Sequence, residues 1–173
     1  MLLPPLYRKL LLALHLLTSV GWIGAVIAYL ALGLAASATR DPEVVRATWI
    51  GMELIGWRVL LPLAGSSLVT GIAVALLSRW GLFRYYWVIF ALVITALATL
   101  VLALHLPDVS ATTEVVRSAE PASVVDHGGD LFHAGLAVGA LVAVLLLNVY
   151  KPPGMTRYGW RRRQRQRTSN SAS

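Results

Sequence analysis

The sequence predicts an all-α integral membrane protein, an up-down-up-down four-helix bundle with both termini in the cytoplasm. Its 173 residues are 57% hydrophobic and only 13% charged, which is far from the composition of an ordinary soluble domain. The chain contains four apolar runs, each near the roughly 20 residues that a helix needs to cross a hydrocarbon core of about 30 Å. We place the four spans at about 10–36, 55–78, 86–106 and 130–150.

Small residues in these spans are typical of closely packed membrane helices. Lipid gives helices no hydrophobic reason to associate, so small residues and interhelical hydrogen bonds do most of the work. In the first span, small residues follow one another at steps of three or four, which places them along one stripe of a helix. These residues are Gly21, Gly24, Ala28, Ala31 and Ala35. The fourth span has Gly135 and Gly139 at G-x-x-x-G spacing, and we expect both sets to be packing surfaces.

The triplet Ala-Ser-Ala at 36–38 offers an alternative, a cleaved signal peptide. The apolar region of a signal peptide has about 7 to 15 residues, and the first apolar run is much longer. We therefore treat it as a span.

The distribution of charge orients the bundle. With both termini in the cytoplasm, eleven of the fifteen basic residues lie on the cytoplasmic side, and seven of these eleven fall between Lys151 and Arg167. All eight acidic residues then lie on the other side. Because cytoplasmic loops are enriched in Lys and Arg, we expect a multi-pass protein of the bacterial cytoplasmic (inner) membrane, with the lipid bilayer as its main partner.

The chain divides into a four-helix domain, residues 1–155, and a basic tail, residues 156–173. The tail ends in "RRRQRQRTSNSAS", which has nothing to bury, and we expect it to be disordered. A basic segment next to a membrane span attracts anionic lipid. The formal net charge of +7 is therefore assigned to lipid and not to nucleic acid. A homo-oligomer or a membrane-protein partner stays open.

His15 is the sharpest candidate for chemistry in the first span. It lies roughly 10 Å along the helix from Arg8 and Lys9, inside the hydrocarbon. Ionisable groups at such depth usually face the bundle interior or a cofactor. The structural alternative is a neutral imidazole that is hydrogen-bonded to a serine, a threonine or a carbonyl of a neighbouring helix.

A second group of polar residues gathers near the last span, in "VVDHGGDLFH". His105, before Pro107, ends the third predicted span, and His133 begins the fourth, so both lie at the outer side. Facing imidazoles there suit axial ligation of haem, or a metal ion joined by Asp130 or His127. The alternatives are a helix C-terminal residue for His105, an N-cap for Asp130, and a Gly-rich loop for Asp126 and His127.

The residue types narrow the chemistry. The chain has no cysteine, which excludes disulfides, thiolate metal sites and a cysteine nucleophile. It also lacks the P-loop, nucleophile-elbow and H-E-x-x-H motifs. These absences favour a binding role over catalysis, and they leave His, Asp, Glu and Met as the metal ligands.

Several segments carry a resemblance to known membrane proteins. The segments "LHLLTSVGWIGAV", "MELIGW", "WGLFRYYWV" and "VYKPPGMTRYG" give nearly the whole chain, up to about residue 160, a likeness to a family of small bacterial four-span integral membrane proteins, a domain of unknown function. This resemblance implies the four-span fold and brings no activity with it.

A more distant resemblance concerns the first span. His15, Trp22 and Gly24 form the pattern H-x6-W-x-G, which is similar to the first helix of copper-resistance D-type proteins and of the membrane protoporphyrinogen oxidase that binds haem b. The resemblance implies that His15 and Trp22 handle metal or haem. The further ligands of the oxidase have no matching motif here, so oxidase activity is not implied.

These observations favour a membrane protein that binds haem b, copper or another divalent metal ion through histidines, in a redox, haem-handling or metal-handling role. The cofactor-binding residues are then His15, Trp22, His105 and His133, and the alternative metal site is His105, His133 and Asp130. A second hypothesis is a non-catalytic scaffold or assembly partner with structural histidines. A third is a small-molecule or ion permease with a water-filled cavity lined by Ser66, Thr70 and Thr95.

Overall fold

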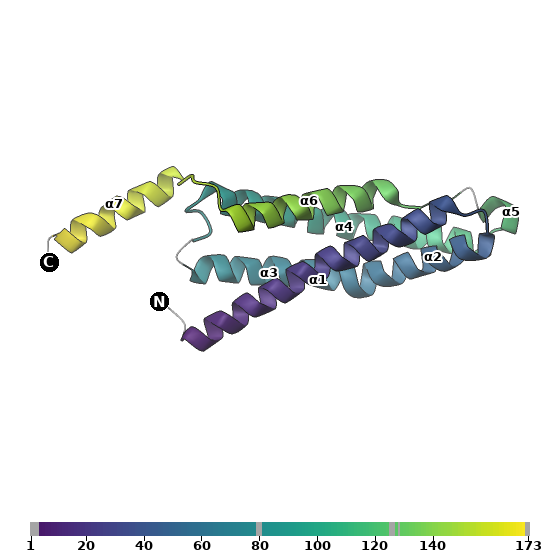
Figure 1. Ribbon diagram of the computed structural model, residues 1–173, viewed down its shortest axis with the longest axis horizontal. Coiled ribbons are helices and arrows are strands. Elements are labelled where there is room, and N and C mark those ends of the chain that lie inside the picture. The colour runs from purple at the N-terminus through teal and green to yellow at the C-terminus, as the bar shows by residue number, and fades with distance from the viewer. Residues whose placement is uncertain (1–3, 79–80, 125–126, 128, 172–173) are drawn as a thin grey trace.

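A computed structural model describes residues 4–78, 81–124, 127 and 129–171 of the chain. Four long apolar helical rods lie along the long axis of the molecule (Figure 1), which confirms the predicted all-α membrane bundle. The elements are α1 (Pro5–Ala38), α2 (Pro42–Ile55), the π-helical turn η1 (Gly56–Leu60), α3 (Leu61–Leu77), α4 (Tyr86–Ser118), α5 (Pro121–Val124), α6 (Leu131–Tyr150) and α7 (Arg157–Ser171). Because α2, η1 and α3 are continuous, they form a single rod.

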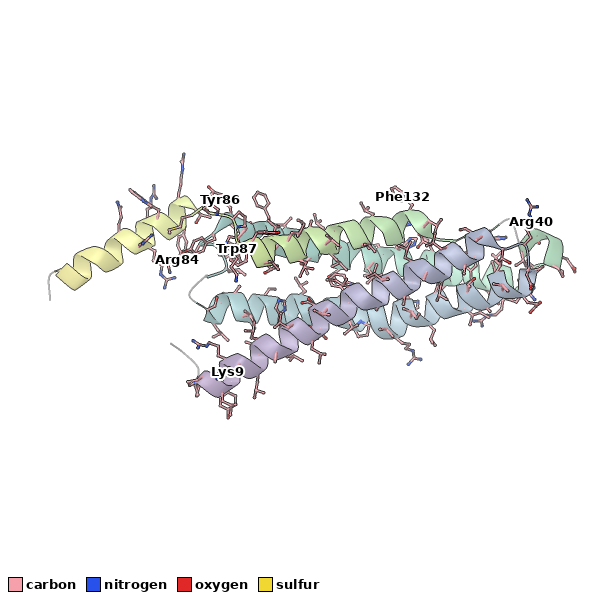
Figure 2. The ribbon with its side chains drawn as sticks, viewed as in Figure 1. Lys9, Arg40, Arg84, Tyr86, Trp87 and Phe132 are labelled. Carbon is pink, nitrogen blue, oxygen red and sulfur yellow. The ribbon has the colours of Figure 1, made fainter. Side chains whose placement is uncertain are left out.

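The four rods enclose one common core. Helix α1 packs against α2, α3 and α6, and α4 packs against the same three helices. Both chain termini lie at one end of the bundle, whereas α5 and the α1–α2 connection lie at the other (Figure 1). Lys9 and Arg84 lie toward the end with the termini, and Arg40 lies at the opposite end (Figure 2).

Three of the rods are much longer than a bilayer core. Helix α1 has 34 residues, the rod from Pro42 to Leu77 has 36 and α4 has 33, so each is about 50 Å long at 1.5 Å per residue. Helix α6 has 20 residues and matches a core of about 30 Å. Counting the same length from Tyr86 along α4 reaches His105 and Leu106, so the rest of α4 projects beyond the apolar slab. We call this projection, made of α2, α5 and residues 107–118 of α4, the head.

The head has its own hydrophobic core. The seven largest fully buried side chains of the described residues lie in the head or at its base: Val45, Met52, Leu106, Val109, Thr113, Val116 and Val124. In contrast, only 11–22% of the residues in the most apolar window of each span are buried. Water drives apolar side chains together in the head, whereas lipid solvates them in the spans.

This packing explains why α4 does not end where the sequence predicted. Pro107 breaks one helical hydrogen bond, and a proline inside a helix costs about 3 kcal/mol. Nevertheless α4 continues through Pro107 to Ser118. The continuation buries Val109 and Val116 against the head core, and the Thr113 hydroxyl donates to the Val109 carbonyl (2.8 Å) and reaches that of Trp49 (3.3 Å). Burial of the α4 residues after Pro107 therefore outweighs the tendency of proline to end a helix.

The second rod contains a π-turn that the sequence analysis did not predict. Pro62 cannot donate a backbone hydrogen bond, and the preceding turn, Gly56–Leu60, widens so that the Leu61 amide donates to the Gly56 carbonyl five residues back. A side chain at Gly56 would meet Leu106 of α4. The glycine therefore allows α4 to pass close to the rod directly beside His105.

Most of the predicted stripe of small residues in α1 is not the packing surface; within it, Gly21 is half-buried beside Leu63 of α3. Gly24, Ala28, Ala31 and Ala35 are exposed, and a side chain at Gly24, Gly135 or Gly139 would have no atom within 4 Å. The buried face of α1 is instead formed by Thr18, Trp22, Val26, Tyr29, Gly33 and Ala36. Residues at steps of three and four lie on one face of a helix, but this spacing does not tell which face is buried. In α1 a row of small residues and a row of larger residues both have this spacing.

The tail also differs from the prediction of disorder. Residues from Arg157 to Ser171 form the helix α7, which extends away from the bundle (Figure 1). Arginine and glutamine are good helix formers. Local propensity therefore accounts for a helix in a segment that has little apolar surface to bury.

Polar side chains join α1 to α3 inside the apolar slab. The Ser19 and Ser67 hydroxyls are 2.8 Å apart, and His15 Nδ1 lies 3.1 Å from Thr70 Oγ1. Thr70 is 8% exposed and is one of the residues that the permease hypothesis assigns to a water-filled cavity. Its hydroxyl lies instead in the α1–α3 contact.

The change Thr70→Val is expected to weaken this contact. Interhelical hydrogen bonds in membranes contribute on average about 0.6 and at most about 1.7 kcal/mol, so the free energy of unfolding in mixed micelles should fall within that range. Thr99→Val is the matched control, because the Thr99 hydroxyl donates to Thr95 of its own helix (2.8 Å). Equal losses in the two variants would contradict the interhelical role of Thr70.

Candidate metal centre

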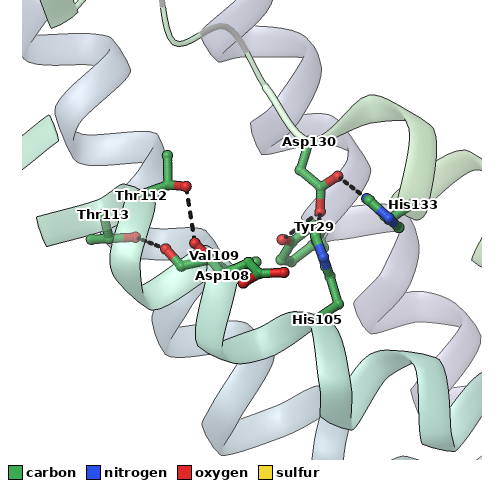
Figure 3. Close-up of polar contacts among 8 residues, drawn as sticks. All are labelled: Tyr29, His105, Asp108, Val109, Thr112, Thr113, Asp130 and His133. Atoms are coloured by element: carbon green, nitrogen blue, oxygen red, sulfur yellow. Dashed lines mark hydrogen bonds and ion pairs between the residues drawn. The ribbon is translucent and has the colours of Figure 1, made fainter. Parts of the chain in front are cut away.

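The Asp130 carboxylate is the centre of a polar cluster at the base of the head. His105 Nε2 of α4 donates to Asp130 Oδ2 (2.6 Å), and His133 Nδ1 of α6 donates to Oδ1 (2.9 Å). The Tyr29 hydroxyl of α1 donates to Oδ2 (3.1 Å). Side chains from three helices therefore converge on one carboxylate (Figure 3), and we call these four residues the Asp130 cluster.

Close backbone packing holds Asp130 in place. The Ser37 hydroxyl donates to the Gly33 carbonyl (3.0 Å) and accepts from the Gly129 amide (2.9 Å). A side chain at Gly129 would collide with the Gly33 backbone. Glycine at both positions thus lets the segment before α6 lie directly on α1, which brings Asp130 to Tyr29.

Asp130 is not a helix cap, which was one alternative from the sequence. It occupies the position before α6, but its side chain accepts no backbone hydrogen bond there. Both carboxylate oxygens are directed to the imidazoles and the phenol instead. An exposed aspartate usually caps, whereas this side chain is only 9% exposed and is surrounded by stronger donors.

His105 is not a helix C-terminal residue either. Helix α4 continues for 13 residues after it, so the predicted interaction with a helix end is wrong. Its neighbour Leu106 is 1% exposed and lies over Gly56. Packing of Leu106 against the π-turn therefore sets the direction in which His105 points.

The two imidazoles lie face to face. The ring centroids of His105 and His133 are 3.8 Å apart and the rings are inclined by 28°. Axial ligation of one haem would require both rings to point end-on at the iron from opposite faces. Stacked rings do not have this arrangement, so the geometry does not favour a haem shared by His105 and His133.

The same geometry suits a small ion. His105, Asp130 and His133 each offer one ligand atom, and these three atoms lie within 4.8 Å of one another. Bonds of about 2.0–2.1 Å in tetrahedral geometry require ligand atoms about 3.3 Å apart, which small side-chain rotations can reach. His133 is 43% exposed and His105 19%, so the group is open on one side. The Tyr29 oxygen lies beside these ligands.

The electrostatics favour an ionised Asp130. Burial opposes ionisation, but the hydrogen bonds from His105, His133 and Tyr29 outweigh it, so the pKa of the carboxyl lies below its usual value. An ionised carboxylate between two imidazoles is the form that a cation requires.

His15 and Trp22 are not part of the Asp130 cluster. His15 lies 14 residues before Tyr29 on α1, about 21 Å along the helix, and Trp22 is buried in the core (3% exposed). The Thr70 hydroxyl donates to the Ser66 carbonyl (2.6 Å), so it accepts from His15 Nδ1, and neutral His15 keeps its lone pair on Nε2. This contact matches the structural alternative for His15.

His127 also lies apart from the cluster. His127 Nδ1 donates to the Ser123 carbonyl (3.0 Å). Asp126, the remaining residue of the polar segment, lies outside the described residues. The sequence patterns therefore predicted His105, Asp130 and His133, but they did not connect Tyr29 with them. The sequence did contain one indication of a role for Tyr29: it is the only tyrosine in the first predicted span.

Comparisons with protein-family models, curated proteins and solved structures found no match to this chain. Fold and site together define its class, a multi-pass helical membrane protein with a His–Asp–His group that could hold a metal ion. Any more specific function has to be inferred from this group.

Gly129→Ala is expected to displace Asp130, because the new methyl group would collide with the Gly33 carbonyl. Overpacking of this kind costs about 1–3 kcal/mol, measured as a loss of unfolding free energy in mixed micelles. Gly135→Ala is the matched control: its new side chain meets open space, and alanine in a helix is favoured over glycine by up to about 1 kcal/mol. Unchanged stability of Gly129→Ala would contradict the close approach of this segment to α1.

Proposed function

We propose that the protein binds a divalent transition-metal ion through His105, Asp130 and His133 and has a metal-handling role in the bacterial cytoplasmic membrane. The observation that carries this proposal is the convergence of two imidazoles and a buried carboxylate at the base of the head. Two nitrogens, one oxygen and an open position are a common ligand set for Zn²⁺ and for non-haem Fe²⁺.

The absence of thiolates makes the proposal more specific. Soft Cu⁺ prefers cysteine and methionine sulfur, and this chain has no cysteine. Imidazole and carboxylate suit divalent ions such as Zn²⁺, Cu²⁺ and Fe²⁺. Tyr29 supports the site as a hydrogen-bond donor that orients Asp130, since partners of ligating carboxylates tune metal affinity.

Ion binding would replace the hydrogen bonds within the cluster. In the metal-free arrangement each imidazole donates a ring N–H to Asp130. When a nitrogen ligates an ion, that proton has to leave, and in the neutral ring it is carried by the other nitrogen. His105 would then ligate through Nε2 and His133 through Nδ1, the two atoms that now face the carboxylate.

We also infer that the head lies outside the cytoplasm and that both termini lie inside. The asymmetry of basic residues supports this orientation. An ion would then reach the site from the outer face. Because the chain has no native cysteine, one cysteine introduced into the head can test the orientation by its reaction with an impermeant reagent added to whole cells.

Metal analysis of the purified protein tests the proposed site. After chelation and dialysis, the protein should bind about one Zn²⁺ or Co²⁺ ion, and His105→Ala, His133→Ala and Asp130→Asn should each weaken binding by at least about 10–100-fold, because even residues that only orient ligands have effects of that size. His127→Ala is the matched control, since it removes a histidine outside the cluster.

The control also separates the proposal from its main alternative. If the native protein binds no ion, or if His127→Ala loses as much affinity as His105→Ala, the proposed site is wrong. The Asp130 cluster would then be a structural tie between helices, as expected for a non-catalytic scaffold.

A second candidate is a haem b held by His15 alone. The observation that favours it is the hydrogen bond to Thr70, because ligating histidines usually donate their other ring N–H to a fixed partner. Adding hemin to the purified protein should then produce a Soret band that His15→Leu removes and His105→Ala does not. A featureless spectrum would exclude this candidate.

A further inference from the structure

The start of α7 is fastened to the end of the bundle. The Thr156 amide donates to the Arg84 carbonyl (3.0 Å), and the Tyr86 amide donates to the Gly154 carbonyl (3.3 Å). The Thr156 hydroxyl donates to the Phe83 carbonyl (2.7 Å) and accepts from the Gly159 amide (3.0 Å). The segment before α7 is therefore paired with the residues before α4, which fixes where α7 begins.

Close packing continues into the first turn of α7. A side chain at Gly159 would lie 2.5 Å from the Arg84 carbonyl, so glycine allows the helix to begin directly against the α3–α4 connection. Helix α4 begins and α6 ends beside this contact. The base of α7 therefore lies at the edge of the apolar slab.

The first turns of α7 combine exposed aromatic and basic side chains. Tyr158 is 58% exposed and Trp160 57%, and the arginines at positions 157, 161, 162 and 163 are also exposed. Tyrosine and tryptophan concentrate at the headgroup level of membranes, and arginine binds phosphate through paired N–H groups.

Among the described residues, no acidic side chain forms an ion pair with these arginines. All eight acidic residues fall within 41–53 and 108–130 of the sequence, and residues 131–173 contain none. The seven that the structure describes lie in or beside the head. The basic surface therefore lies at the opposite end of the bundle from these seven acidic residues. Its counter-charge has to come from outside the chain.

We propose that the first turns of α7 form a binding surface for the headgroups of anionic phospholipids. The lipid phosphates are recognised by Arg157, Arg161 and Arg162, while Tyr158 and Trp160 enter the headgroup layer. Position favours lipid over nucleic acid, because the base of α7 is fixed where a bilayer surface lies. Attraction of basic side chains to an anionic surface extends over about one Debye length.

A spin label can test this surface, since the chain has no native cysteine. Full-length, metal-free protein with Gln164→Cys carries a nitroxide and is placed in nanodiscs of phosphatidylcholine, with or without phosphatidylglycerol. Phosphatidylglycerol should immobilise the label and expose it to lipid-soluble oxygen, and high salt should reverse the effect. R157Q/R161Q/R162Q should lose the immobilised component, whereas the control R40Q/R58Q/R117Q, which neutralises three arginines in or next to the head, should keep it.

Equal label mobility in both kinds of nanodisc would overturn the proposal, as would equal loss in the control variant. Immobilisation by an RNA oligonucleotide but not by phosphatidylglycerol would overturn it as well and assign the surface to nucleic acid. Because the protein is free of metal throughout, these outcomes do not depend on the Asp130 cluster.

Discussion

A carboxylate at the edge of a hydrocarbon core has to be surrounded by hydrogen-bond donors, because an unpaired charge there is costly. Asp130 obtains its donors from α1, α4 and α6, so satisfying one side chain fixes the relative positions of three helices. The glycines at 33 and 129 allow the necessary close approach. Whatever the cluster binds, it is also an interhelical contact at the base of the head.

The bundle is held together by different forces in its two parts. In the head, Met52, Val109 and Val116 are buried by the ordinary hydrophobic effect. In the apolar slab, hydrogen bonds such as those of His15 and Ser19 join α1 to α3. The Asp130 cluster lies where these two parts meet, so the group is partly exposed while the packed core of the head supports it.

The sequence predicted the four spans well, because a long apolar run has few other outcomes. It also predicted that His105 and His133 lie at the same end of the bundle, because one residue ends a span and the other begins the next, antiparallel span. It could not predict the continuation of α4 through Pro107. The continuation depends on packing against side chains of α5 and of α2, which is distant in sequence. The bond of Tyr29 to Asp130 joins residues 101 positions apart, and no local pattern carries such information.

X-ray absorption at the metal edge shows directly whether the imidazoles of α4 and α6 and the Asp130 carboxylate converge on one ion. For protein loaded with one equivalent of Zn²⁺, we expect scattering from two imidazoles with nitrogens at about 2.0–2.1 Å, together with an oxygen ligand. A spectrum of oxygen ligands without imidazole scattering would contradict this expectation, since the ion would then lie elsewhere on the protein.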